Sequence, residues 1–78
     1  SEVVVKYSLP REGEVELVVY NALGQVVRRL AEGYRGMGHH RVVWDGRDDV
    51  GRGLATGIYV VRLRAGDFAQ VRKVLFLK

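Results

Sequence analysis

Three aspartates in the long glycine-rich stretch after Trp44 come closest to a chemical site. Asp45, Asp48 and Asp49 fall within five residues, and clustered carboxylates are ligands that calcium prefers. Their spacing does not match the calcium loop of a helix-loop-helix site, because Arg47 stands among them and no acidic residue closes the loop. Aspartates also accept backbone amide bonds in turns, and an arginine balances their charge. We therefore predict a turn-stabilising role, with calcium binding as the less favoured alternative.

No catalytic arrangement is evident elsewhere in the chain. Glycoside hydrolysis needs two carboxyl groups facing each other across a cleft, whereas the glutamates fall on predicted strand exteriors. There is no nucleophile elbow and no phosphate-binding glycine loop before a helix. His39 and His40 are adjacent in a strand pattern, so they face opposite sides, and we expect His40 at the core or an edge. With no cysteine to help, the histidines alone do not make a metal site, and we expect a non-catalytic domain with no cofactor.

Length and composition indicate one folded domain over residues 1–78. The apolar fraction is 47% and the charged fraction 28%, which is typical of a globular chain. No apolar run is long enough to span a membrane, and the start of the chain resembles a strand and not a signal peptide. The net charge of +4 comes from the second half, which has eight bases and four acids. Without a recognised module or stacking aromatics, we expect solvated faces and edge-strand guards, and no nucleic-acid partner.

Hydrophobic alternation predicts an all-β fold, an immunoglobulin-like antiparallel sandwich of six to seven strands. The expected strands cover residues 2–9, 14–20, 25–31, 39–45, 58–65 and 68–77. Residues 10–13 are expected to turn the chain with a positive backbone angle at Gly13, so that the first two strands form a hairpin. The third strand is predicted to be bulged, and residues 32–38 to form a glycine-punctuated loop. A slip in the apolar pattern predicts another bulge near Arg72 and Lys73.

The stretch from Trp44 to Leu63 is the central feature of this plan. Trp44 is the only tryptophan, so it is expected to be the main aromatic of a small core. Tyr59 lies in the most regular alternation of the chain and is expected to face inward. We predict that Trp44 and Tyr59 anchor the core on either side, while the loop between them crosses from one sheet to the other.

Five segments carry a resemblance to known families, namely residues 5–13, 19–27, 44–52, 55–59 and 72–78. In this order they resemble the C-terminal sorting domain of the type IX secretion system. The chain also resembles the immunoglobulin-like domain of the flagellar hook-capping protein, which shares the Trp-Asp-Gly-Arg and Gly-Ile-Tyr segments. The sorting domain is the favoured interpretation, because the resemblance extends to a basic and apolar last strand.

The sorting-domain resemblance implies three short motifs, which fall here on residues 10–13, 57–59 and 73–78, with Pro10, Gly13, Gly57, Tyr59, Lys73 and Lys78 as marker residues. It implies a non-catalytic module that directs a larger exported protein, such as a hydrolase, across the outer membrane and attaches it to the cell surface. The implied partners are the outer-membrane translocon with its sorting machinery, and lipopolysaccharide as an anchor. The Asn-Pro-rich lead-in that often precedes such domains is absent.

Two other functions stay open at this point. One is a structural assembly domain, as in the flagellar hook cap. The other is a carbohydrate-binding accessory module, which would need several exposed rings on one face, whereas Tyr20, Tyr34 and Phe68 fall in different segments. The last strand also has two interpretations. In one, a partner recognises it by strand addition to its exposed backbone or by acidic residues that bind Lys73 and Lys78. In the other, the strand is part of the core through Val74 and Phe76.

Overall fold

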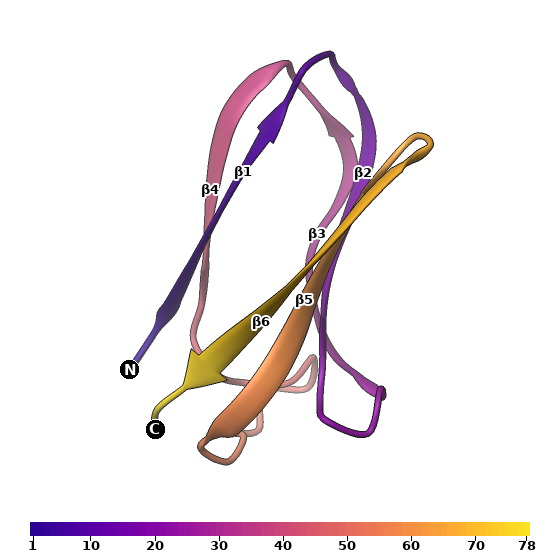
Figure 1. The fold of residues 1–78 in the computed structure, drawn as a ribbon. Helices are drawn as coiled ribbons and strands as arrows, with labels where there is room; N and C mark the ends of the chain where they lie inside the picture. The colour runs from indigo at the N-terminus through magenta and orange to yellow at the C-terminus, as the bar shows by residue number, and fades with distance from the viewer.

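The computed structural model describes all 78 residues. The chain folds into six β-strands and contains no helix. The strands are β1 (Val3–Leu9), β2 (Gly13–Tyr20), β3 (Val26–Arg35), β4 (Gly38–Trp44), β5 (Gly57–Ala65) and β6 (Phe68–Phe76). They make a two-stranded sheet, β1-β4, and a four-stranded sheet, β3-β2-β5-β6, both antiparallel. The two sheets pack face to face (Figure 1), which confirms the predicted all-β, immunoglobulin-like sandwich.

The predicted hairpin of the first two strands is wrong. Strand β1 pairs with β4, with Val3 opposite Trp44, whereas β2 lies between β3 and β5 in the other sheet. The apolar faces of β1 and β2 are both buried, and they meet across the core because residues 10–12 carry the chain from one sheet to the other. Gly13 is the first residue of β2 and does not have the positive backbone angle that we expected.

Strand β3 is longer than predicted and removes most of the expected loop at residues 32–38. It continues to Arg35, and β4 begins at Gly38, so only two residues connect them. Gly33 and Gly38 adopt positive φ angles of 111° and 117°, so glycine is used inside and at the ends of strands here. Two register shifts against β2 confirm that β3 is bulged.

The predicted bulge in β6 is absent, because β5 and β6 pair without a register shift from Gly57–Phe76 to Ala65–Phe68. The slip in the apolar pattern has another cause. Val71 lies opposite Arg62 on the outer face and is 63% exposed, whereas Val74 lies opposite the buried Tyr59. Arg72 lies opposite the buried Val61, so this arginine occupies a core-facing position. The first half of β6 therefore presents polar residues toward the interior.

The core is a cluster of 12 buried residues contributed by both sheets. Trp44 at its centre has no exposed surface, and its ring lies 5.2 Å from the ring of Tyr59 and 5.3 Å from that of Phe76. The loop between β4 and β5 crosses from the two-stranded to the four-stranded sheet, as predicted. Because one sheet has two strands and the other four, the smaller sheet leaves part of the larger one uncovered beside β1.

Candidate functional site

Asp48 organises the loop between β4 and β5. Its Oδ1 accepts hydrogen bonds from the backbone amides of Val50 (3.1 Å) and Arg52 (2.9 Å), and its Oδ2 accepts one from Arg52 Nε at 3.2 Å. The Asp48 amide donates to the Arg52 carbonyl at 2.9 Å, which closes the turn. The Arg52 amide is the main reason that the pKa of Asp48 is below its ordinary value, although desolvation acts in the opposite direction.

Asp45 and Asp49 attach the same loop to β3. Arg28 Nη1 donates at 3.0 Å both to Asp45 Oδ1 and to the Arg47 carbonyl, and the Arg29 amide donates to Asp49 Oδ1 at 2.9 Å. Desolvation raises the pKa of Asp45, but the Arg47 amide and the Arg28 guanidinium outweigh it, so that this pKa is lowered. The loop is therefore fixed to the four-stranded sheet by charge-assisted hydrogen bonds.

The three aspartates do not converge on a common point. Asp45 and Asp49 both lie within 4.0 Å of Arg28, whereas Asp48 binds the amides of its own turn and Arg52. No group of three or more acidic, histidine or cysteine side chains is placed to hold a metal ion. Their geometry supports the turn-stabilising interpretation.

The lowered pKa of Asp48 predicts a pH-dependent stability. A carboxyl with a lower pKa in the folded than in the unfolded chain stabilises the fold above its unfolded pKa, about 3.9, and this contribution is lost as the pH falls through the folded value. The melting temperature should therefore decrease between about pH 5 and pH 2. Asp48→Asn keeps an oxygen acceptor but loses the charge, so its melting temperature should be lower at neutral pH and depend less on pH.

Differential scanning calorimetry across this pH range checks the prediction. Asp67→Asn is the matched control, since Asp67 forms no side-chain hydrogen bond or ion pair in the turn between β5 and β6. Its profile should follow that of the wild type. A profile of Asp48→Asn that runs parallel to the wild type would contradict the role assigned to the Asp48 charge.

The residues of the first two expected motif segments lie at element boundaries and in the core. Pro10 lies in the connection from β1 to β2, and Gly13 begins β2. Gly57 begins β5 opposite Phe76. Tyr59 is buried against Trp44, and its hydroxyl donates to the Ala55 carbonyl at 2.6 Å. These residues come from separate parts of the sandwich and do not form a joint surface.

The third segment, residues 73–78, is part of the core as well as an edge. Phe76 is 4% exposed and packs on Trp44, and Val74 is half-buried against the same cluster. Lys73 is exposed on the outer face opposite Val60, and the Lys78 amide donates to Thr56 Oγ1 at 2.9 Å. The interpretation of the last strand as core therefore accounts for its apolar positions.

Removal of residues 73–78 is expected to unfold the domain, because loss of Phe76 alone costs about 3–5 kcal/mol and half of β6 is lost with it. A domain of 78 residues has roughly 4–12 kcal/mol of stability. Circular dichroism of the truncated chain checks this. Removal of the exposed residues 77–78 is the control and should leave the fold intact. A folded chain ending at residue 72 would contradict the core role.

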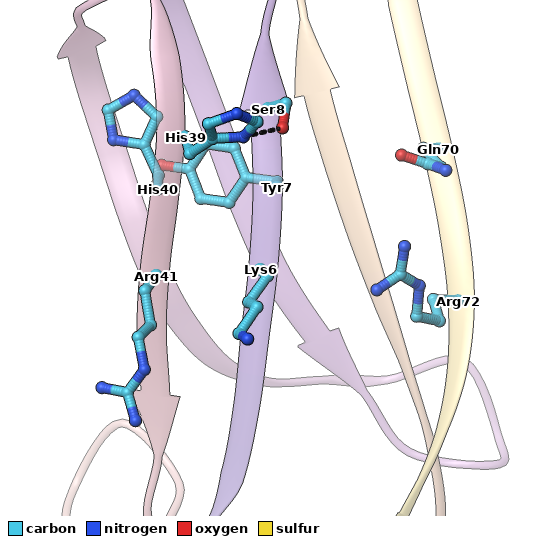
Figure 2. A pocket seen from close by; sticks show the side chains of 8 residues that line it. All are labelled: Lys6, Tyr7, Ser8, His39, His40, Arg41, Gln70 and Arg72. Atoms are coloured by element: carbon cyan, nitrogen blue, oxygen red, sulfur yellow. Dashed lines mark hydrogen bonds between the residues drawn. The ribbon is translucent and has the colours of Figure 1, made fainter.

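A polar depression of the surface is an open groove between β1 and β6, with a volume of about 600 Å³. We call it the basic groove, and Figure 2 shows its eight lining residues: Lys6, Tyr7, Ser8, His39, His40, Arg41, Gln70 and Arg72. They come from β1, β4 and β6, which lie far apart in the sequence. Three of the side chains are permanent cations, and none is acidic.

The β1–β4 wall of the basic groove is held by its own contacts. The rings of Tyr7 and His40 stack at 5.0 Å with an interplanar angle of 16°, and His40 Nε2 donates to the Gly36 carbonyl at 2.7 Å. Ser8 Oγ and His39 Nδ1 share a hydrogen bond of 2.7 Å. This pair resembles the nucleophile and base of a hydrolase, but no carboxylate lines the groove to orient the imidazole. The pair therefore lacks the third member that such chemistry uses.

The cations of the basic groove have no acidic partners within the domain. All four ion pairs of the structure lie between Arg28, Arg47 or Arg52 and the loop aspartates. Lys6 and Arg41 lie opposite each other in the β1–β4 pair and share its outer face, and Arg72 forms the facing wall on β6 (Figure 2). The groove is therefore an unneutralised cationic surface.

The sequence patterns do not predict this groove. They predict solvated faces and edge guards for the bases of the second half, and a bulge near Arg72. The available signal was the two-residue period of β6, in which Gln70 and Arg72 share a phase with the inward-facing Val74 and Phe76. Two polar residues at core-facing positions indicate that the interior is uncovered at that end of the strand.

Two antiparallel sheets around a buried tryptophan, joined by a long crossing loop, define an immunoglobulin-like β-sandwich. The family model described as the FlgD Ig-like domain matches residues 1–67, and the chain belongs to this family.

A solved structure described as FlgD from P. aeruginosa has a TM-score of 0.76 and 24% sequence identity to this chain. The similarity covers 96% of this chain and 59% of that one, so the chain spans less than two thirds of that protein. No curated protein sequence matches the chain. The structure contains no helix with the length and hydropathy of a membrane span.

The expected role in type IX secretion is wrong. The family match is to the FlgD Ig-like domain, and the structural match is to FlgD, which is the other branch of the resemblance. The physical reason for the error is that the two shared segments build the sandwich, since they form the crossing between the sheets and the start of β5, and the last strand that favoured the sorting domain is explained by its core position through Phe76. The shared segments identify the fold and carry no information that separates the two branches.

Proposed function

We propose that this chain is a non-catalytic assembly module of a flagellar hook-cap protein. The observation that carries the proposal is the match of residues 1–67 to the FlgD Ig-like domain. The similarity of 96% of the chain to the FlgD structure supports it at the level of the fold. In this role the module acts outside the cell, on a growing flagellar structure, and its partners are other protein subunits.

The surface of the sandwich suits protein contacts better than chemistry. The outer face of the four-stranded sheet exposes Ile58 and Leu75 opposite each other on β5 and β6, and Val71 lies further along β6 on the same face; exposed apolar side chains that lie together favour protein association. The basic groove adds a charged surface at the edge of the same sheet. The exposed aromatic residues Tyr34 and Phe68 lie on β3 and β6, the opposite edges of that sheet, and do not form one platform for sugars.

Deletion of this domain from its parent gene in the source bacterium tests the proposal. Cells that carry the deletion should lack complete hooks and filaments in electron micrographs and should not swim, while growth is normal. Restoring the full-length gene should restore hooks, and a parent protein carrying Val50→Ala, a change at an exposed loop residue, should act as the wild type. Normal hooks in the deletion strain, with the shortened parent still present in immunoblots, would overturn the proposal.

A further inference from the structure

Strand β1 has an open edge beside an uncovered part of the other sheet. It has a strand neighbour on one side only, namely β4, so half of its backbone hydrogen-bonding groups face away from the sheet. Across the basic groove, Gln70 and Arg72 of β6 occupy core-facing positions that no strand of the smaller sheet covers. Figure 1 shows β1 and β6 running past each other at this side of the sandwich. There is space here for a third strand next to β1.

The floor of this space is apolar and its rim is basic. A small depression between the sheets is lined by apolar side chains from β1, β2, β5 and β6, which are Val4, Val5, Tyr7, Leu17, Val61, Leu63 and Val74. Lys6, Gln70 and Arg72 line both this depression and the basic groove. A strand beside β1 would place alternate side chains over the apolar depression and the others next to Lys6. An occupant with alternating apolar and acidic residues matches both surfaces.

We propose that an extended acidic segment of a partner protein adds to β1 as a third strand of the smaller sheet. Its apolar side chains lie over the depression between the sheets, and its carboxylates lie beside Lys6, with Arg41 one strand further away on the same face. Arg72 forms the opposite wall and attracts the same segment. The inference rests on the proposed role as an assembly module, and it names the chemistry of the partner.

Charge complementarity and the open edge together select a peptide over other anions. The three cations have no acidic partner in the domain, which favours any anion, but only a peptide backbone matches the unpaired edge of β1. Binding of single-stranded nucleic acid relies on aromatic rings that stack with bases. The one aromatic ring of the groove other than histidine, Tyr7, is 8% exposed and already stacked on His40.

A synthetic peptide tests the proposal. The probe is a capped heptapeptide, Thr-Glu-Val-Glu-Val-Glu-Thr, whose length matches the seven residues of β1. Titration into the isotopically labelled 78-residue chain should shift the amide resonances of β1 and β6 and slow the hydrogen exchange of β1. The same peptide with lysine in place of glutamate should not bind. A version with N-methyl groups on every residue should bind much more weakly, because both of its edges lack the N–H groups that the ladder with β1 requires.

Charge-reversal variants locate the site. Lys6→Glu and Arg72→Glu should each weaken binding of the acidic peptide by roughly tenfold or more. Lys73→Glu is the matched control, since Lys73 is next in sequence to Arg72 but is exposed on the outer face of β6. It should bind the peptide within about twofold of the wild type. Circular dichroism of each variant establishes that the fold is retained before binding is compared.

Several results would overturn the proposal. These are no binding of the acidic peptide, equal binding of the N-methylated peptide, equal weakening by Lys73→Glu, or tighter binding of a single-stranded oligonucleotide of equal charge. Failure of the strand-addition proposal can be distinguished from failure of the proposed hook-cap function. Loss of hooks in the deletion strain together with no peptide binding would reject only the strand addition, whereas intact hooks together with peptide binding would reject only the hook-cap role.

Discussion

Gly46→Ala is expected to destabilise the domain by about 2–5 kcal/mol, which is a large part of the roughly 4–12 kcal/mol available to a chain of 78 residues. Gly46 has a φ angle of +77°, and a side chain in this left-handed conformation costs about 1–2 kcal/mol. An added Cβ would also overlap the ring of Phe76, which is itself buried against Trp44. Overpacking of a filled core adds about 1–3 kcal/mol.

Gly51→Ala separates the two contributions. Gly51 has a similar φ angle of +88°, but an added Cβ there meets no atom within 4 Å. This variant should lose only the conformational part, about 1–2 kcal/mol. Urea denaturation followed by circular dichroism measures both losses. Equal losses for the two variants would contradict the contact between Gly46 and Phe76.

The contact between Gly46 and Phe76 can also be measured with a double-mutant cycle. In a Phe76→Ala background the ring is absent, so a further Gly46→Ala change should cost no more than Gly51→Ala does in that background. The difference between the costs of Gly46→Ala in the two backgrounds is the coupling free energy of the pair. If the Phe76→Ala chain is too unstable to measure, Phe76→Leu serves as the background and should show a smaller coupling. The crossing loop and the last strand are therefore expected to be one energetic unit.

The faces of the strands could be predicted from the sequence, whereas their neighbours could not. A two-residue period shows which side chains are buried, and Val15, Leu17 and Val19 are buried as that period indicates. The period does not state which strand lies alongside. The β1–β2 connection is short enough for a hairpin, yet the chain uses it to cross between sheets. Burial of two apolar faces against each other decided the topology.

The aspartate loop could be predicted from the sequence, whereas the basic groove could not. Asp45, Asp48 and Asp49 are close in sequence, and their local hydrogen bonds follow from the ordinary behaviour of aspartate in turns. Lys6, Arg41 and Arg72 come together only when three strands have been assembled into two sheets of unequal width. A site of this kind depends on long-range pairing, which local patterns do not contain.

Trp44→Ala is expected to remove about 3–5 kcal/mol of stability and leave much of the population unfolded. Trp44 has no exposed surface and packs against Tyr59 and Phe76, so truncation opens a cavity between the two sheets. Its indole Nε1 also donates to the Arg47 carbonyl at 3.0 Å, which attaches the crossing loop to the core. Denaturation with urea, followed by far-ultraviolet circular dichroism, measures the loss.

Trp44→Phe distinguishes packing from this hydrogen bond. The Arg47 carbonyl also accepts a hydrogen bond from Arg28 Nη1 at 3.0 Å, so loss of the indole donor does not leave it unpaired, and the lost ring volume should dominate. We therefore expect a smaller loss than for Trp44→Ala, roughly 1–3 kcal/mol. Phe68→Ala is the aromatic control, because Phe68 is 51% exposed and should cost about 1 kcal/mol or less. If Trp44→Phe cost as much as Trp44→Ala, the hydrogen bond to the loop would outweigh the packing, and the core would depend on the crossing loop more than on its aromatic rings.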